Sequence, residues 1–470
     1  MTDLNKTENN ELFKFTIGEK KYNKIHFIGI GGVSMSGIAL LLSKFGYEIS
    51  GSDRSESKYL AHLRDNQIEV HIGQKAENIT DQDLFVYTDA ILPDNEELLA
   101  AKATGKHLVS RGEFLGALMR NYKRAIAVSG SHGKSTTTSM ISKILVDAQA
   151  DASILLGGML DEIDGNVLVG QSDILLTEAC EYKANILYYY PSTAIILNID
   201  EDHLDYFKDL NHIVETFIGY MKNLNEDSKA IINIDDENTH RLFKHVKGQL
   251  ITFGESENAD YRIENIQYNS TGFPSFQLVH NGQVMEFSLE ILGNYNIYNA
   301  VAAAIAAMEN GIDLETTQKS LRSYRPLHRR MEIVGQYQGA TIMTDYGHHP
   351  VEIKNTLHSL QKMKKNRIVS VFQPHTFSRT KALLNDFAES FYEADEVIVT
   401  EIFPARENFD PTIKSEDVVE RLKNNGVNAR YIKDFEEAKQ YIQSTIQEGD
   451  ICMTTGCGNP DVLAEMIVNN

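Results

Sequence analysis

The segment AIAVSGSHGKSTTT, residues 125–138, constrains the fold more than any other part of this chain. An apolar run enters a glycine turn, and Gly133-Lys134-Ser135 leads into a helical pattern. Such a turn presents unpaired backbone N–H groups and a lysine to phosphate oxygens. The usual loop reads G-x-x-x-x-G-K-[ST], but Val128 occupies the position of its first glycine. The segment therefore predicts a shortened phosphate loop between a strand and a helix.

Two later segments supply groups that suit a metal beside this loop. Lys134 is expected to contact phosphate, and the Ser135 hydroxyl to hold Mg²⁺. Glu178 closes the apolar stretch DILLTE, and His203 follows AIILNID. If both stretches are parallel strands, their carboxyl ends share one sheet edge with the loop. Glu178 and His203 are then predicted to reach a metal, with a surface carboxylate and a capping histidine as the alternatives.

Strand–loop–helix patterns open three parts of the chain. Its 470 residues suit about three domains of roughly 100–200 residues each. The alternation of strands and helices predicts an α/β class with parallel sheets. We expect a Rossmann-like N-terminal domain, a central domain resembling phosphate-loop ATPases, and a C-terminal Rossmann-like α/β domain. Their predicted ranges are 1–122, 123–329 and 330–470.

The composition excludes several classes of protein. The chain has 45 basic and 66 acidic residues, a net charge of −21, which argues against binding nucleic acid or anionic membranes. Three cysteines form a sparse, odd set that suits a reduced cytoplasmic protein. The apolar run AVAAAIAAM is far shorter than the ~20 residues of a membrane span. We expect a cytoplasmic monomer or homodimer with no stable membrane insertion.

The first domain carries a second glycine turn. Gly29-x-Gly31-x-x-Ser34 is close to a dinucleotide-binding fingerprint, and Asp53 ends the next predicted strand, where an acid would hold a ribose hydroxyl. An NAD-dependent oxidoreductase is therefore one alternative. The sixth position is serine instead of glycine or alanine, which weakens the match. A helix N-terminus of this kind holds any diphosphate, including that of a UDP-sugar.

Taken together, the motifs resemble the Mur ligases of peptidoglycan synthesis, and most of all the alanine-adding branch of that family. The resemblance covers residues from about Lys24 to Val468. It implies ATP-driven ligation of L-alanine to the carboxylate of UDP-N-acetylmuramate, through an acyl phosphate that the alanine amine then attacks. The motifs that carry it occur in the family's order: HFIGIGGVSMSGIA, GSHGKS, TEACEY, NIDEDHLDYF, GNYNIYNAVAA, TDYGHHPVEI and FQPHTFSRT.

The resemblance also implies a role for each matching residue. The catalytic set would be Lys134, Glu178, His203, His348 and Arg379, and Mg²⁺ would be held by Ser135, Glu178 and His203. UDP-N-acetylmuramate would contact Gly29, Gly31, Gly32, Asp53 and His71, while L-alanine would meet His375 and Arg379. ATP would be bound by Gly130, Ser131, His132, Gly133, Lys134, Ser135, Thr136, Asn296, Asn299, Arg329 and Asp345.

The chain departs from the family pattern at a few positions. Tyr295 stands where the family often has histidine, and an aromatic ring can still stack on adenine. Cys180 replaces an acid in the usual E-A-D-E motif, which removes one carboxylate beside the metal. Sister ligases carry a carbamylated lysine well after the D-H motif. Here Lys208 is the only lysine within fifteen residues of His203 and lies close to it, so no carbamate is predicted.

Two further alternatives remain besides the oxidoreductase. A sister ligase that attaches a tripeptide to the same UDP-sugar would share every catalytic element and differ in the third domain. A non-enzymatic nucleotide switch would need neither the metal-binding set nor a separate substrate domain.

Overall fold

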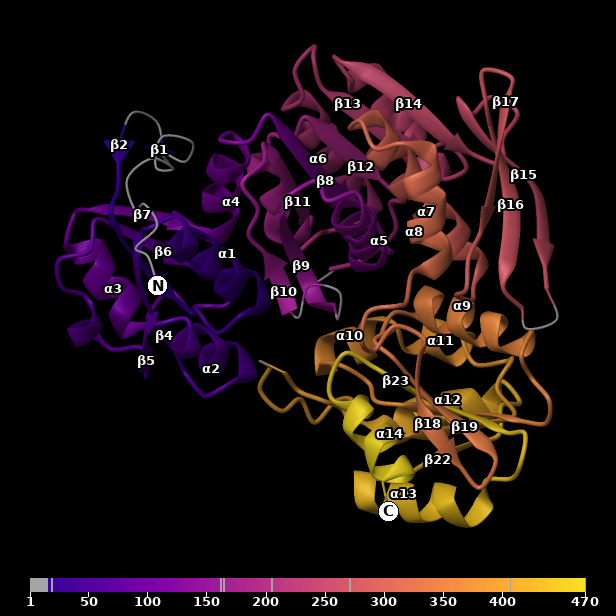
Figure 1. Cartoon of the computed structure of the whole chain (residues 1–470). Helices are drawn as coiled ribbons and strands as arrows, with labels where there is room; N and C mark the ends of the chain where they lie inside the picture. The colour runs from indigo at the N-terminus through magenta and orange to yellow at the C-terminus, as the bar shows by residue number, and fades with distance from the viewer. Residues whose placement is uncertain are drawn as a thin grey trace, which may run out of the picture. The chain divides into compact units, whose positions relative to one another are not determined.

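The computed structural model describes residues 16–17, 20–160, 163, 165–203, 206–269, 272–405 and 407–469 (Figure 1). Their contacts divide the chain into two compact units. Among the described residues, no helix combines the length and apolar character that crossing a bilayer requires. The first unit comprises Met1–Arg262, His280–Gly282 and Asn299–Leu321, and the second comprises Ile263–Val279, Gln283–Tyr298 and Arg322–Asn470.

The first unit begins with a short antiparallel pair, β1 (Thr16–Ile17) and β2 (Lys20–Lys21), followed by a five-stranded parallel sheet in the order β5-β4-β3-β6-β7. Alternate strand residues face opposite sides, so helices can cover both. The sheet's strands are β3 (Lys24–Ile28), β4 (Glu48–Asp53), β5 (Glu69–Ile72), β6 (Leu84–Tyr87) and β7 (His107–Ser110). The helices are α1 (Val33–Lys44), α2 (Lys58–Asp65), η1 (Ala76–Asn78), α3 (Glu96–Ala103) and α4 (Arg111–Met119).

Side-chain packing confirms that this sheet is covered on both faces. Phe27 of β3 joins the apolar core that includes Leu41 of α1 and Phe114 of α4. Its neighbour Ile28 instead packs with Leu98 of α3 on the opposite face. This doubly wound arrangement is the Rossmann-like fold that the sequence predicts.

A larger sheet follows, in the order β10-β9-β11-β8-β12-β13-β14-β15 within the first unit. Its strands run parallel from β9 to β15, and β10 is antiparallel to β9. The strands are β8 (Arg124–Ser129), β9 (Ser153–Leu160), β10 (Gly165–Leu168), β11 (Ile174–Glu178), β12 (Thr193–Ile196), β13 (Lys229–Asn233), β14 (Gln249–Gly254) and β15 (Tyr261–Tyr268). The helices are α5 (Lys134–Asp147), η3 (Tyr182–Tyr188), α6 (Leu210–Lys222), η4 (Glu237–His245) and, in part, α7 (Asn294–Glu309) and α8 (Leu314–Ser323).

The two sheets of the first unit share one apolar core. Helix α4 approaches η3 closely because it carries glycine at two positions one turn apart. A Cβ on Gly112 would lie 2.0 Å from Asn185 Oδ1, and one on Gly116 would lie 1.9 Å from the Tyr188 carbonyl oxygen. Elsewhere Asn166 of β10 donates a 2.8 Å hydrogen bond to the Val33 carbonyl at the start of α1.

The second unit contains the remainder of β15 with β16 (Pro274–His280, in part) and β17 (Gln283–Ser288), and a six-stranded sheet in the order β18-β19-β23-β20-β21-β22. The six strands are parallel except for β18, which is antiparallel to β19. They are β18 (Glu332–Tyr337), β19 (Ala340–Asp345), β20 (Ile368–Phe372), β21 (Glu396–Val399), β22 (Ala429–Tyr431) and β23 (Ile451–Thr455). The helices are α9 (Pro350–Gln361), α10 (Phe377–Ala382), α11 (Leu384–Ala388), α12 (Ser415–Asn424), α13 (Phe435–Thr445) and α14 (Pro460–Val468).

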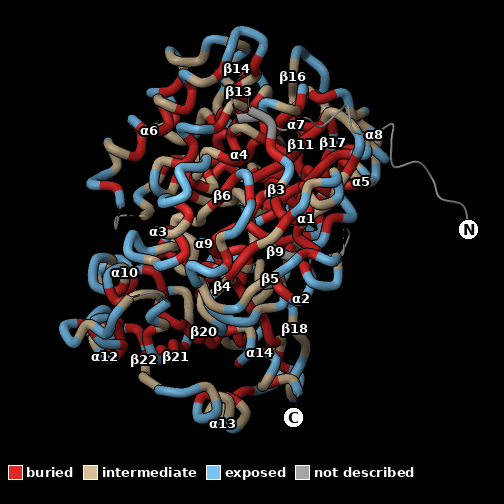
Figure 2. Tube along the Cα trace, turned by 90° about the vertical axis from the view of Figure 1, so that its left-hand side faces the viewer, coloured by how far each residue is buried: buried red, intermediate tan, exposed pale blue. Residues whose placement is uncertain are grey.

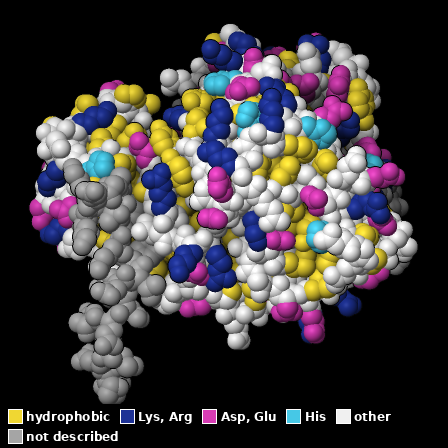
Figure 3. All heavy atoms as spheres, turned by 90° about the horizontal axis from the view of Figure 1, so that it is seen from above, with side chains coloured by type: hydrophobic (Ala, Val, Ile, Leu, Met, Phe, Trp, Pro, Cys, Tyr) yellow, Lys and Arg dark blue, Asp and Glu magenta, His cyan; other side chains and the backbone are white. Residues whose placement is uncertain are grey.

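Two apolar clusters lie on opposite faces of this sheet. Phe372 of β20 packs with Leu357 of α9, whereas Val371 packs with Leu463 of α14. Figure 2 shows buried positions along strands such as β20 and β21, with exposed positions on the outer side of helices such as α13. On the face drawn in Figure 3, basic side chains are interspersed with acidic ones. The α/β class predicted from the sequence is confirmed.

Candidate active site at the phosphate loop

The loop between β8 and α5 requires its glycines. Gly130 has a φ of 136° and Gly133 a φ of 85°, in the region that side chains with a Cβ rarely adopt. A Cβ on Gly133 would also lie 2.5 Å from Asn299 Oδ1 of α7. Helix α5 begins at Lys134, and Gly133 is its N-cap residue. Backbone N–H groups at the start of this helix have no partner within it, which suits an anion.

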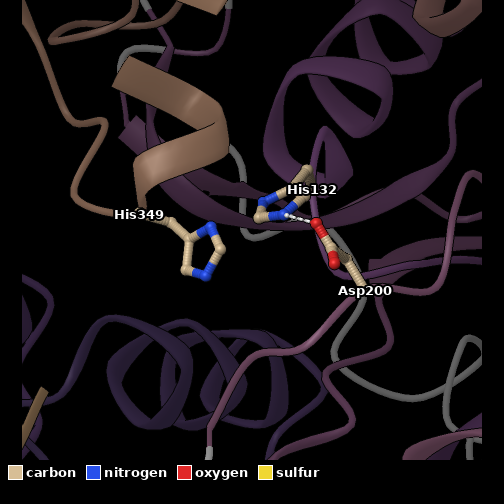
Figure 4. A group of neighbouring side chains, drawn as sticks. All are labelled: His132, Asp200 and His349. Carbon is tan, nitrogen blue, oxygen red and sulfur yellow. Dashed lines mark hydrogen bonds and ion pairs between the residues drawn. The ribbon is translucent and has the colours of Figure 1, made fainter. Parts of the chain in front are cut away.

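The segment that follows β12 holds the loop in place. The Ser131 Oγ accepts a 2.8 Å hydrogen bond from the Asp200 N–H and donates at 3.1 Å to the Asp200 carbonyl. The His132 N–H donates to Asn198 Oδ1 at 2.8 Å, and the Asn198 side-chain amide donates to the His132 carbonyl at 3.1 Å. His132 Nε2 lies 3.4 Å from Asp200 Oδ2, the dashed pair of Figure 4, which also labels His349 of the second unit. Asn198 and Asp200 were not predicted as supports.

Lys134 lies within the loop, with its ammonium surrounded by oxygen atoms. Its Nζ donates to the Gly130 carbonyl at 2.5 Å and to the Ser131 carbonyl at 3.0 Å. It also lies 3.2 and 3.1 Å from the two carboxylate oxygens of Glu181. Burial, the largest single influence, lowers the pKa of Lys134, but the interactions with Glu181, Cys180 and Asp202 together outweigh burial and leave that pKa raised. The lysine is therefore fully charged at neutral pH.

The predicted metal residues Ser135 and Glu178 are in contact. The Ser135 hydroxyl donates a 3.1 Å hydrogen bond to Glu178 Oε2, and the Gly157 N–H donates to Glu178 Oε1 at 2.7 Å. Glu178 is the last residue of β11, which pairs directly with β8. The sheet therefore brings this carboxylate to the phosphate loop, as the parallel-strand argument predicts.

His203 belongs to a second group of possible ligands. One ligand atom from each of Glu181, Asp202 and His203 lies within 4.8 Å of the others. His203 Nε2 is 3.5 Å from Asp202 Oδ2 and 4.0 Å from Glu181 Oε1, and its ring packs on Tyr182. The φ of His203 is 54°, a conformation that non-glycine residues seldom adopt. Glu181 was not assigned from the sequence, although its position three residues after Glu178 is a usable signal.

The chemistry of these groups fits a divalent cation. Carboxylate and hydroxyl oxygens are the ligands that Mg²⁺ prefers, and a site beside phosphate typically uses one or two carboxylates. Ser135 with Glu178, and Glu181 with Asp202, supply such oxygens next to the start of α5.

In the first sheet, the carboxylate predicted to hold a ribose binds the glycine turn itself. Asp53 Oδ2 accepts a 2.8 Å hydrogen bond from the Gly31 N–H, and Asp53 Oδ1 accepts one from the Arg54 N–H at 2.7 Å. Gly29 has a φ of 86°, and its N–H donates to the Ser52 carbonyl. Gly32 is the N-cap residue of α1. The turn is therefore well defined, with its helix N-terminus available to an anion.

His71 lies on the edge strand β5, where it pairs in register with Ser52 of β4. Its Nε2 is 3.4 Å from Glu69 Oε1, and the side chain is about one-third exposed, at 37%. The strand thus places His71 close to the carboxyl end of β4, where Asp53 follows Ser52.

The second unit brings together its own predicted residues around the end of β19. Asp345 is buried and accepts hydrogen bonds from the Met331 N–H at 2.9 Å and the Gly347 N–H at 2.8 Å. Burial raises the pKa of this carboxyl group. The His348 ring lies 6.2 Å from the His375 ring, measured between centroids. These residues therefore lie at the carboxyl ends of β19 and β20, the two strands that flank β23.

The predicted arginines and asparagines have structural contacts as well. The Arg329 guanidinium donates to the Gly456 and Gly458 carbonyls, both at 2.9 Å, and Arg379 lies in the first turn and a half of α10. The Asn296 amide donates to the Leu292 carbonyl at 2.7 Å, which ties the first turn of α7 to the segment that precedes the helix. Tyr295 precedes Asn296 in the chain. Burial raises the pKa of the Tyr295 hydroxyl, and the negative charge of Asp345 raises it further.

Comparison with known proteins identifies relatives over nearly the full chain. Three family models match in succession: "Mur ligase family, catalytic domain" over residues 24–123, "Mur ligase middle domain" over 128–307, and "Mur ligase, glutamate ligase domain" over 329–458. A UDP-N-acetylmuramate–L-alanine ligase of Alkaliphilus metalliredigens is 43% identical over 97% of this chain and 99% of its own. One from Caldanaerobacter subterraneus is 42% identical, over 94% and 96%. The crystal structure of such a ligase from Thermotoga maritima matches with a TM-score of 0.79 and 28% identity, over 95% of this chain and 98% of that one.

Proposed function

The chain belongs to the Mur ligase family, and we propose that the loop between β8 and α5 drives its reaction with ATP. It is a ligase that adds L-alanine to UDP-N-acetylmuramate in peptidoglycan synthesis, as its relatives at about 42% identity indicate. The resemblance inferred from the sequence is thereby confirmed. These relatives disfavour the tripeptide-adding ligase, the oxidoreductase and the nucleotide switch.

In our proposal, three domains with the ranges 1–122, 123–329 and 330–470 each bind a different substrate of the reaction. The first would bind the UDP part of the sugar at Gly29, Gly31 and Gly32, with Asp53 holding the turn. The doubly wound sheet and the free N-terminus of α1 support this role, because a helix N-terminus favours a diphosphate. His71 would lie at the edge of the same site.

The central domain would bind ATP and Mg²⁺. The family is ATP-dependent, and the loop from Gly130 to Thr136 has the backbone geometry that phosphates require. Ser135, Glu178 and His203 would hold Mg²⁺, and the Ser135–Glu178 contact is the observation that carries this proposal. When bound, the metal would neutralise charge on the phosphates and on the sugar's carboxylate. Asn296 and Asn299 would lie near adenine.

The reaction then follows from charge and proximity. Lys134 and the N–H groups of α5 would hold the phosphoryl oxygens, where negative charge is concentrated. The lactyl carboxylate of the sugar attacks the γ-phosphorus, ADP leaves, and an acyl phosphate results. The alanine amine attacks the acyl carbon, loses a proton, and expels inorganic phosphate as the amide forms.

The C-terminal domain would bring L-alanine to the acyl phosphate. Arg379 suits the alanine carboxylate, because a guanidinium binds a carboxylate through two parallel hydrogen bonds. His348 and His375 lie on neighbouring loops and would line the same site. Asp345 would complete the ATP site from this domain, and Arg329 would do so from the junction between the central and C-terminal domains.

The test of this function is amino-acid-dependent phosphate release. Purified protein receives UDP-N-acetylmuramate, ATP and Mg²⁺ with L-alanine, glycine, L-serine or the tripeptide. We expect phosphate release that depends on L-alanine and on the UDP-sugar. Release that requires the tripeptide would support the sister ligase instead, and a change in absorbance with NADH would support the oxidoreductase.

A further inference from the structure

The side chain of Lys134 has its hydrogen-bonding capacity filled by the protein. A lysine ammonium has three N–H donors. Those of Lys134 are directed at the Gly130 carbonyl, the Ser131 carbonyl and the Glu181 carboxylate. A phosphate oxygen can therefore gain a hydrogen bond from Lys134 only if one of these three acceptors is given up.

Glu181 is the acceptor that has another partner available. The two carbonyls belong to the loop that bears Lys134, and they are fixed by its backbone. Glu181 lies outside the loop, 4.0 Å from His203 Nε2 and in one group with Asp202. Its carboxylate can therefore exchange an ammonium for a cation held by these neighbours.

The exchange must be coupled to a cation, because Glu181 is almost fully buried. Its side chain is 2% exposed, and that of Lys134 is 14% exposed. A buried carboxylate that loses its only cation is strongly destabilised. Among the described residues, Lys134 is the one ammonium in contact with Glu181. Release of Lys134 to a phosphate therefore needs a second positive charge beside Glu181.

We propose that Glu181 is a positioning residue that holds Lys134 in the loop until a divalent cation takes over its carboxylate. The inference rests on the proposed binding of ATP and Mg²⁺ at this site. Glu181 then acts through Lys134, and it makes capture of the nucleotide phosphates depend on metal. The same carboxylate keeps the lysine charged and aimed at the loop.

The experiment measures binding of a non-hydrolysable ATP analogue by calorimetry, once with Mg²⁺ and once with EDTA. For the wild type, removal of metal should weaken binding strongly. For Glu181→Gln, metal-free binding should strengthen by about tenfold, because a charge-assisted hydrogen bond no longer competes for Lys134. The ratio of the affinity with Mg²⁺ to the affinity with EDTA should therefore be smaller for Glu181→Gln than for the wild type.

Two controls separate this mechanism from a general loss of negative charge. Glu201→Gln removes an exposed carboxylate of the same segment and should leave the ratio unchanged. Glu181→Gln in a Lys134→Ala background should have no effect on metal-free binding, since the partner through which Glu181 acts is absent. An equal effect in both backgrounds would overturn the proposal.

Metal-free binding by Glu181→Gln that equals or falls below that of the wild type would also contradict it. If Glu181→Gln does not fold, Glu181→Asp decides the question, because its shorter side chain withdraws from Lys134 while keeping the charge. The expected result is again tighter metal-free binding. Since the readout is nucleotide binding without L-alanine, its outcome is independent of whether the chain ligates L-alanine.

Discussion

The hydroxyl of Ser135 donates a 3.1 Å hydrogen bond to Glu178 Oε2, which joins the first turn of α5 to the last residue of β11. Two segments more than forty residues apart meet there because β11 pairs with β8.

Loss of the Ser135 hydroxyl should impair turnover more than folding. In Ser135→Ala, one metal ligand is removed, so we expect turnover to fall by at least about tenfold, as for a hydrogen bond to a charged group. Ser135→Thr keeps the hydroxyl and should retain activity. The measurement is steady-state phosphate release over a range of Mg²⁺ concentrations. Ser139→Ala, a buried change on the same helix, is the control; an equal loss there would point to the fold of α5.

Removal of Lys134 should abolish turnover and spare binding of the sugar. Lys134→Ala deletes the cation expected at the phosphoryl oxygens, so we expect a loss of at least about a hundredfold. UDP-N-acetylmuramate should bind to the variant as it does to the wild type, measured by calorimetry without nucleotide. If binding of the sugar is lost as well, the proposed division of labour between the domains is wrong.

Alanine at position 133 should destabilise the protein and weaken nucleotide binding. Gly133 combines a φ of 85° with a Cβ position 2.5 Å from Asn299 Oδ1, so we expect a cost of about 1–3 kcal/mol. Gly282→Ala is a matched control, since Gly282 has a φ of 78° and nothing within 4 Å of its Cβ position. Urea unfolding and nucleotide titration distinguish the two. If both variants lose the same stability and the same nucleotide affinity, backbone strain alone explains the effect and the contact with Asn299 does not contribute.

The thiol of Cys180 should react slowly at neutral pH. Burial, followed by the negative charge of Glu181, raises its pKa to about 11, against about 8.5 for a free cysteine. The thiolate is the reactive form, so the rate should rise with pH and still be rising between pH 9 and 10. At pH 8 we expect alkylation at least about tenfold slower than for N-acetylcysteine. Site-resolved mass spectrometry measures it, and a plateau by pH 9 would contradict the raised pKa.

The sequence was sufficient for the parts of the site that are local. The strand, the glycine turn and the start of α5 are contiguous, so the loop around Lys134 could be predicted from residue order. Glu178 and His203 were predicted to approach it because strand ends share a sheet edge, and Glu178 does so. The α/β class followed from the same alternation of strands and helices.

The contacts of the site that could not be predicted from the sequence are those between segments distant in the chain. Asn198 and Asp200 hydrogen-bond to the loop because β12 lies beside β8, and neither residue type by itself indicates that role. Glu181 contacts Lys134 because the chain after β11 turns toward the loop. The carboxylate of Asp53 is predicted to hold a ribose, and the hydrogen bond that it accepts from the Gly31 N–H was not foreseen. Such contacts depend on backbone positions that residue order does not specify.

The transfer of oxygen tests the central claim most directly. UDP-N-acetylmuramate labelled with oxygen-18 in its lactyl carboxylate is incubated with the protein, ATP, Mg²⁺ and L-alanine, and the released phosphate is analysed by mass spectrometry. If the carboxylate is phosphorylated and the alanine amine then displaces phosphate, each phosphate carries one labelled oxygen and the product amide retains the other. Phosphate without the label, or release that does not require L-alanine, would contradict the account.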